Sequence, residues 1–332
     1  MSSKQLISQI PIRQLISMNQ GQNYWFNGCM DFLMECLSED RAYDYWFFSG
    51  VTGDSFLQIF SKDSEKMTLC YSDIATDAAV QKAFDACGYY YEHIKGITNS
   101  SDRAQYDLRI RQFIDKGIPV IARVDDPFHS FAIICGYDEN QVYCIKGESN
   151  TPESCCYDEL IFVTCKKAKS SLADAYKNVV MNIPSLITMP ETPNYSFGKK
   201  AFIDWASSFQ NGTFDAYSID HKLWYTHESP TFNCWNQHGT YLCMLGTNNC
   251  ACGFLENALK HNPDMSIIHK LIPLYSKLNG EGFHALIDME DGFRIKPEVV
   301  KDRERMSSVS KKIMELSKIC DKISEVFHEI SN

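Results

Sequence analysis

The fold is decided by residues 22–33, which read Gln22-Asn23-Tyr24-Trp25-Phe26-Asn27-Gly28-Cys29-Met30-Asp31-Phe32-Leu33. Turn residues there give way to apolar positions at helical spacing, so we expect a helix with Cys29 in its first turn. The free N–H groups and the dipole of a helix N-terminus stabilise a thiolate, the nucleophilic form of cysteine. Gln22 and Asn23, just upstream, offer side-chain amides for an oxyanion hole. The competing interpretation is a buried structural cysteine.

A nucleophilic cysteine needs a base, and the best candidate is His129. This histidine opens an apolar run that ends at a polar turn, residues 138–140, and a second run follows. That pattern predicts a β-hairpin, with His129 at the start of its first strand. The order of amide, helix cysteine and strand histidine is the layout of papain-like thiol enzymes.

Four motifs carry a family resemblance: Asn27-Gly28-Cys29, Gly50-Val51-Thr52-Gly53-Asp54-Ser55-Phe56, Pro119-Val120-Ile121, and His129 followed by Gly136-Tyr137-Asp138. With them, residues 21–165 resemble a papain-like domain of the kind found in butirosin biosynthesis protein H and in bacteriocin-processing cysteine peptidases. The resemblance implies Cys29 as nucleophile, His129 as base, and Gln22 or Asn23 as oxyanion amide. It implies either acyl transfer from a carrier-bound thioester or peptide cleavage.

One feature of that pattern is missing. Papain-like enzymes usually orient the histidine with an Asp or Asn on the returning strand, but residues 143–147 contain neither a carboxylate nor an amide side chain. Glu148 and Asn150 lie just beyond and are the candidates for this role if the strand is offset or bulged. An unoriented histidine has no fixed tautomer or rotamer, which lowers the reaction rate.

Composition places the chain among ordinary globular proteins. It has 332 residues, 44% of them hydrophobic and 22% charged, with a net charge of −10. The acidic balance argues against nucleic acid or an anionic membrane as partner. No apolar run approaches a membrane span and no signal peptide is evident, so the 14 cysteines are expected to be reduced in a cytoplasmic protein.

Helical patterns come first and apolar strands follow, which predicts an α+β domain over residues 1–168. Three prolines between residues 184 and 193 mark a boundary. Beyond it no strand is expected, so residues 169–332 are predicted to form an all-helical domain that covers or extends the cleft.

The final helix carries the clearest pattern in the chain. Apolar residues or cysteine recur at alternating spacings of three and four, at Met306, Val309, Ile313, Leu316, Cys320, Ile323, Phe327 and Ile330. This seam predicts packing along a long neighbouring helix. Partners within the chain, at residues 231–260 and 264–288, are favoured over a homodimer.

Two further groups of residues bear on the site. Cys234, His238, Cys250 and Cys252 have a zinc-like inventory, but a helix between them would hold them too far apart, so neither a metal nor another cofactor is expected. The polar and aromatic stretch from Asn233 to Tyr241 is a candidate substrate surface. Trp235 and His238 in this stretch are candidate substrate contacts, as is Trp25 near Cys29. The alternative for the stretch is a solvated helix face with core aromatics.

The sequence thus predicts thiol-dependent acyl transfer, or amide or thioester cleavage, by a Cys29–His129 pair. The substrate would be a small molecule, a peptide or a carrier-bound acyl group. The alternative is a non-catalytic module on the same fold that binds a small molecule or peptide, since fold does not imply function.

Overall fold

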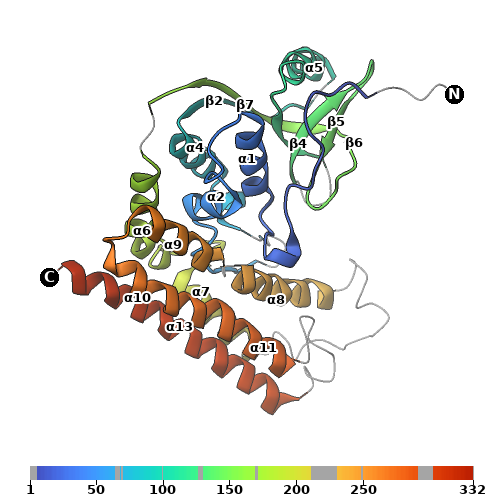
Figure 1. The fold of residues 1–332 in the computed structure, drawn as a ribbon. Coiled ribbons are helices and arrows are strands. Elements are labelled where there is room, and N and C mark those ends of the chain that lie inside the picture. Colours follow the sequence, from blue (N-terminus) through green and yellow to red (C-terminus); the bar gives the residue numbers. More distant parts are fainter. Residues whose placement is uncertain are drawn as a thin grey trace. The chain divides into compact units, whose positions relative to one another are not determined.

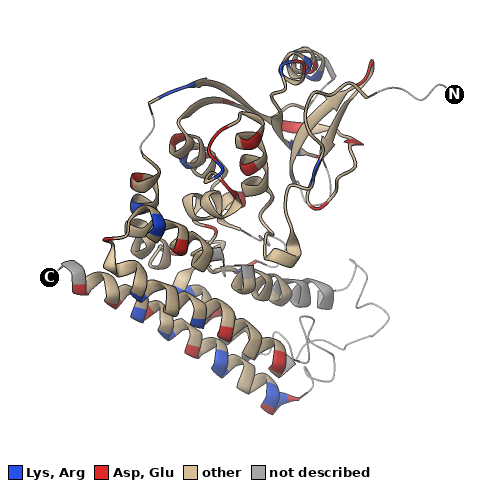
Figure 2. Ribbon diagram, viewed as in Figure 1, with Lys and Arg blue, Asp and Glu red and all other residues tan. Residues whose placement is uncertain are grey.

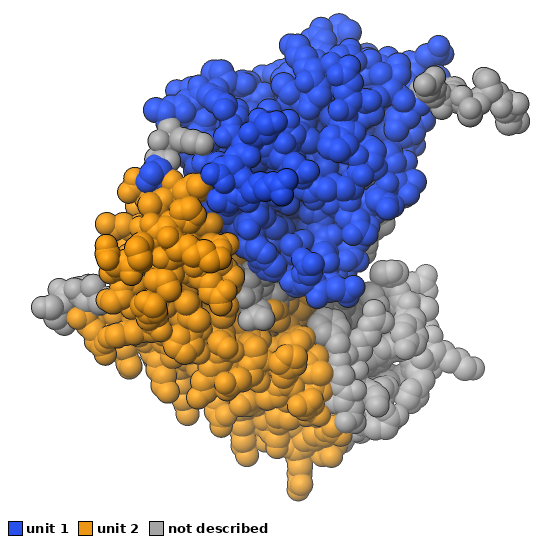
Figure 3. All heavy atoms as spheres, viewed as in Figure 1, with its two compact units in different colours: residues 1–52, 80–171 blue, residues 53–79, 172–332 orange. Residues whose placement is uncertain are grey.

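A computed structural model describes residues 6–63, 68, 70–98, 100–125, 130–168, 171–210, 230–247, 250–290 and 302–331. The chain divides into two compact units (Figure 3). Residues 1–52 and 80–171 form one, called here the sheet unit, and residues 53–79 and 172–332 form the other, called the helical unit. The fold is therefore α+β, with N-terminal helices and an antiparallel sheet followed by a largely helical region.

The sheet unit is built on six antiparallel strands in the order β2-β7-β3-β4-β5-β6. Their bounds are β2 Tyr89–Ile94, β3 Val120–Val124, β4 Phe131–Tyr137, β5 Val142–Ile145, β6 Glu153–Ser154 and β7 Tyr157–Lys166. The central strands β3 and β4 are almost fully buried and, apart from Arg123 on β3, consist mainly of apolar residues, which explains their apolar runs in the sequence. The β4–β5 hairpin predicted from the sequence is confirmed.

Five helical segments accompany this sheet: η1 Met18–Gln20, α1 Trp25–Cys36, α2 Tyr45–Thr52, α4 Thr76–Cys87 and α5 Ser100–Ile114. The division between the two units falls within α4. The helix α1 packs against α2 and against β4 (Figure 1). Its buried residues include Phe26, Met30 and Phe32. Aromatic residues of α2, Phe47 and Phe48, complete this part of the core.

The helical unit contains the helices α3 Tyr71–Ile74, α6 Leu172–Ile187, α7 Gly198–Gln210, α8 Pro230–Thr247, α9 Cys250–His261, α10 Ser266–Tyr275, α11 Gly282–Glu290 and α13 Arg303–Ser331. The prediction of an all-helical domain was wrong in one respect. Strand β1, Ile59–Ser61, pairs with β8, Tyr195–Phe197, in a two-stranded antiparallel sheet. Three-residue strands are too short to show a periodic pattern, so they could not be predicted from the sequence.

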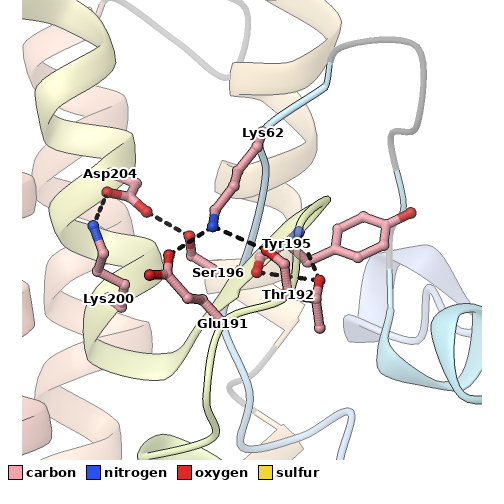
Figure 4. A network of polar contacts seen from close by, with 7 residues as sticks. All are labelled: Lys62, Glu191, Thr192, Tyr195, Ser196, Lys200 and Asp204. Atoms are coloured by element: carbon pink, nitrogen blue, oxygen red, sulfur yellow. Dashed lines mark hydrogen bonds and ion pairs between the residues drawn. The ribbon is translucent and has the colours of Figure 1, made fainter.

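A polar network fixes the β1–β8 pair (Figure 4). Lys62 donates to a carboxylate oxygen of Glu191 at 2.6 Å and to the carbonyl of Thr192 at 2.9 Å. On α7, Asp204 accepts hydrogen bonds from Ser196 and from Lys200. The turn after α6 is thereby held beside β1 and against the start of α7.

The seam of α13 is buried as predicted from Met306 to Phe327, and the side chain of Ile330 lies outside the described residues. Val309, Ile313 and Ile323 have no exposed surface. The helix packs mainly against α7 and also against α10 and α11, so partners within the chain are sufficient to cover it. The predicted partner region 264–288 contains α10 and most of α11, whereas packing against α7 was not predicted. Charged residues of both signs line the rest of α13 (Figure 2).

Between α10 and α11 the helix continues without interruption as a π-helical segment, η3, Ser276–Glu281. Such π-helical insertions are rare and often occur at functional sites. Within the part of the chain that is described, no helix is long and apolar enough to cross a membrane.

Candidate active site

The start of α1 is the centre of the candidate site. Tyr24 has an extended backbone, and its N–H donates to the hydroxyl of Tyr45 at 3.0 Å. The helix begins at Trp25, so Cys29 is its fifth residue and lies at the start of the second turn. The prediction that Cys29 opens the helix was therefore wrong by one turn, because Trp25 and Phe26 are already helical. The free N–H groups of the helix belong to the residues before Cys29.

Cys29 is completely buried, with 0% of its surface exposed. This burial raises the pKa of its thiol well above the ordinary value, and the nearby Cys144 thiol adds to the effect. The direction is opposite to the lowered pKa expected of a helix-terminal thiolate. His129, the predicted base, lies outside the described residues.

A short segment before α1 is packed tightly against the helix. The carbonyl oxygen of Leu15 lies 2.5 Å from the position that a Cβ on Gly28 would occupy. On its other side, the N–H groups of Leu15 and Ile16 donate to the carbonyl of Gly147, at 3.0 and 3.3 Å. Gly147 has a φ of +56° and therefore favours glycine. The segment is thus held between α1 and the loop that follows β5.

Two of the predicted site residues take part in this arrangement. The side-chain carbonyl of Gln22 accepts the N–H of Ser17 at 2.8 Å, which leaves the amide NH2 group as the end able to donate to an oxyanion. A carboxylate oxygen of Glu148 accepts the N–H of Met18 at 2.7 Å. Glu148 therefore anchors the chain next to η1, and this bond engages one of the oxygens that would otherwise orient a histidine.

The remaining predicted residues are distributed as follows. Asn23 and Trp25 are half-buried at the start of α1, and the ring of Trp25 lies 3.6 Å from the position that a Cβ on Gly147 would occupy. Asn150 is exposed in the loop after β5. The side chain of Trp235 lies outside the described residues. Gln22, Asn23, Trp25, Cys29 and Glu148 thus all belong to the sheet unit, the first four within or just before α1 and Glu148 bonded to the segment that precedes it.

His238 belongs to the core of the helical unit. Only 2% of its surface is exposed, and its Nδ1 accepts a hydrogen bond from the indole N–H of Trp205 at 3.0 Å. The rings of Trp205 and Phe209 pack against it. This environment favours the structural alternative that the sequence analysis gave for His238 over a substrate contact.

One contact connects α1 to the strand that follows His129. The rings of Phe26 and Phe131 lie 5.1 Å apart, with an interplanar angle of 56°. Phe26 precedes Cys29 by three residues and shares its face of the helix. Phe131 follows His129 by two residues. Arg123, on β3, extends the cluster with its guanidinium 4.5 Å from the centre of the Phe131 ring.

A second polar cluster on the same sheet was not predicted. Nε2 of His93 on β2 lies 3.0 Å from a carboxylate oxygen of Glu159 on β7, and Arg123 approaches the other oxygen of Glu159. His93 and Arg123 together hold the pKa of Glu159 below its usual value in spite of its burial. The residues come from three strands whose order the sequence does not reveal, so only the sheet topology brings them together.

A hollow near the C-terminal end of α1 is lined mainly by acidic side chains. It measures about 440 Å³ and is lined by Asp31, Glu35, Glu39 and Asp40, with Arg41 and Tyr43. Arg13 bonds to both Asp31 and Glu35. Burial raises the pKa of Asp31 to about 6, and Arg13 opposes that rise. No cluster of metal-binding side chains is found in the described part of the chain.

Comparison with protein-family models and with curated proteins finds no match to this chain.

Proposed function

We propose that the sheet unit is a papain-like domain that performs thiol-dependent acyl transfer, or amide or thioester cleavage. Cys29 is the nucleophile and His129 the base. The observation that supports this pairing is the ring contact between Phe26 and Phe131, because it ties the helix of Cys29 to the strand that begins just after His129.

In the proposed reaction, the sulfur of Cys29 bonds to the acyl carbon as its proton passes to His129. The bond from that carbon to the leaving nitrogen, oxygen or sulfur then breaks, and the leaving group takes the proton from His129. Water or an acceptor attacks the resulting thioester and releases Cys29. The NH2 group of Gln22 or Asn23 stabilises the oxyanion.

The buried position of Cys29 sets a condition on this mechanism. Because burial disfavours the thiolate, the thiol must lose its proton to a base in direct contact, not to solvent. The reactivity of the Cys29 thiol should therefore depend strongly on His129. An acyl thioester or a peptide amide is the substrate class that fits this chemistry.

Site-resolved alkylation tests the proposal. The native chain is treated with iodoacetamide between pH 5 and 10, and mass spectrometry follows Cys29 alongside the exposed Cys165 as an internal control. We expect Cys29 to react at neutral pH, and the His129→Ala variant to lose this reaction without any change at Cys165. If Cys29 stays protected in the native protein at every pH, the catalytic function is excluded.

The second candidate is a non-catalytic module that binds a small molecule or peptide. The complete burial of Cys29 and the raised pKa of its thiol favour it. The same alkylation experiment separates the two, since a structural thiol would react only on unfolding and would not respond to the His129→Ala substitution.

A further inference from the structure

A small enclosed cavity lies in the core of the helical unit. It is lined by Phe56, Gln58, Ile187, Gly198, Phe202, Tyr275, Leu278, Cys320 and Ile323. These residues come from the chain before β1, from α6, α7 and α10, from the π-helical segment η3, and from α13. Most of the lining is apolar, but two of the lining residues, Gln58 and Tyr275, carry polar side-chain atoms.

These polar atoms include the hydroxyl of Tyr275 and the side-chain oxygen Oε1 of Gln58. Tyr275 is 1% exposed and Gln58 is 2% exposed. Neither atom has a hydrogen-bond partner among the described residues. Buried polar groups are nearly always satisfied in folded proteins, by protein groups or by ordered water. Two such atoms on one cavity therefore point to a shared ligand.

The orientation of Gln58 is fixed by its other bonds. Its Nε2 donates to the carbonyl of Tyr241 at 3.2 Å, and its backbone carbonyl accepts the N–H of Gly198 at 2.8 Å. A flipped amide would give up the bond to Tyr241. Oε1 is thus an acceptor that needs a donor, while the hydroxyl of Tyr275 is a donor that needs an acceptor.

We propose that this cavity is a binding site for one water molecule that bridges Tyr275 and Gln58. The free volume is about 10 Å³, which corresponds to a single water and excludes any larger ligand. The water accepts a hydrogen bond from the hydroxyl of Tyr275 and donates one to Oε1 of Gln58. The sulfur of Cys320, on the same wall, is a weak acceptor for the second proton.

The site lies where the helix changes its form. Tyr275 is the last residue of α10, and Leu278 belongs to the π-helical segment that follows. The water therefore connects the segment before β1 to the exact turn at which α10 becomes η3. It stabilises the packing of that turn against residues 56–58.

The Tyr275→Phe substitution tests the site, because a water-bridged hydroxyl and an unsatisfied hydroxyl predict opposite changes in thermal stability. A bridged hydroxyl contributes to stability, so its removal should lower the thermal midpoint of the helical unit by about 2–4 °C. An unsatisfied hydroxyl costs stability, so its removal should raise the midpoint. A raised or unchanged midpoint would overturn the proposal.

Two matched substitutions calibrate the measurement. Tyr241→Phe removes an equally buried hydroxyl that accepts the N–H of Ser61 at 2.9 Å, and it should lower the midpoint in any case. Tyr90→Phe alters a tyrosine that is 54% exposed and should have no effect.

A double-mutant cycle with Gln58→Met then tests the bridge itself. If one water joins both side chains, the loss in the double variant should be smaller than the two single losses combined. Strict additivity would show that the two atoms do not share a ligand. A high-resolution crystal structure of the native chain should show ordered density between them, and its absence would also contradict the proposal.

Discussion

The backbone carbonyl of Leu15 occupies almost the place that a side chain on Gly28 would need. The oxygen lies 2.5 Å from the ideal Cβ position, and Cγ2 of Ile16 lies at 2.6 Å. The motif residue beside Cys29 is therefore glycine because the preceding segment crosses the helix at contact distance, and not because the helix requires flexibility.

The Gly28→Ala substitution should destabilise the sheet unit by about 1–3 kcal/mol, since the backbone of Leu15 must move. Gly239, on α8, is the matched control, because a Cβ there meets no atom within 4 Å. Gly239→Ala should be neutral or stabilise by about 0.5–1 kcal/mol, as expected for alanine in a helix. Urea unfolding measures both. Equal effects in the two variants would contradict the crossing contact.

Asp31 should make stability fall as pH rises from about 4 to 6. Its pKa in the folded chain is about 6, because burial favours the protonated form, whereas an unfolded aspartate titrates near 3.9. The stabilising contribution of this proton is complete at low pH and is lost as pH passes through 6. Asp31→Asn should therefore stabilise the chain at pH 7 by about 1–2 kcal/mol, after allowance for a side chain that is 26% exposed, and should have little effect at pH 4.

Arg13 provides the control for that measurement. Its guanidinium lowers the pKa of Asp31, so Arg13→Met should move the loss of stability to higher pH. Chemical unfolding at a series of pH values follows both variants. An Asp31→Asn variant that is less stable than the native chain at pH 7 would show that the carboxylate is needed in its charged form.

Glu148 allows the anchoring and orienting roles to be separated. Its carboxylate accepts the N–H of Met18, and a glutamine carbonyl can accept the same bond. Glu148→Gln should therefore preserve stability and the alkylation of Cys29, whereas Glu148→Ala should cost about 1 kcal/mol. If Glu148→Gln abolishes the reaction of Cys29 without loss of stability, the residue orients the base instead.

The seam of α13 should carry much of the stability of the helical unit. Ile313 is fully buried, so Ile313→Ala should lower the unfolding free energy by about 2–5 kcal/mol. The nearby Lys311 is exposed, and Lys311→Ala should change the unfolding free energy by less than about 0.5 kcal/mol. Thermal unfolding compares the two variants. A mild effect at Ile313 would mean that the helix is peripheral.

Local patterns predicted much of this fold, and long-range relationships escaped them. The β4–β5 hairpin and the seam from Met306 to Phe327 each follow from a local pattern of apolar residues, so both could be predicted from the sequence. The pairing of Ile59 with Phe197 joins residues far apart in sequence and leaves no local trace.

Some features of the candidate site could also be predicted from local sequence patterns, and others could not. The sequence located Cys29 on a helix and Gln22 just before it, because both follow from turn and helix signals. It did not reveal the burial of Cys29, which depends on how α1 packs against β4. The cluster of His93, Arg123 and Glu159 was also hidden, since strand order alone determines which residues meet.

The division of the chain into units has a consequence for synthesis on the ribosome. Residues 53–79 belong to the helical unit, yet they are translated between the two parts of the sheet unit. The ring partners of Phe56 are Phe254 and Tyr275, about 200 residues later. At roughly 5–20 residues per second, Phe56 and the residues around it wait about 10–40 s for their partners. During that interval Phe56 and its apolar neighbours in the nascent chain are exposed to chaperones, even if the sheet unit has already folded.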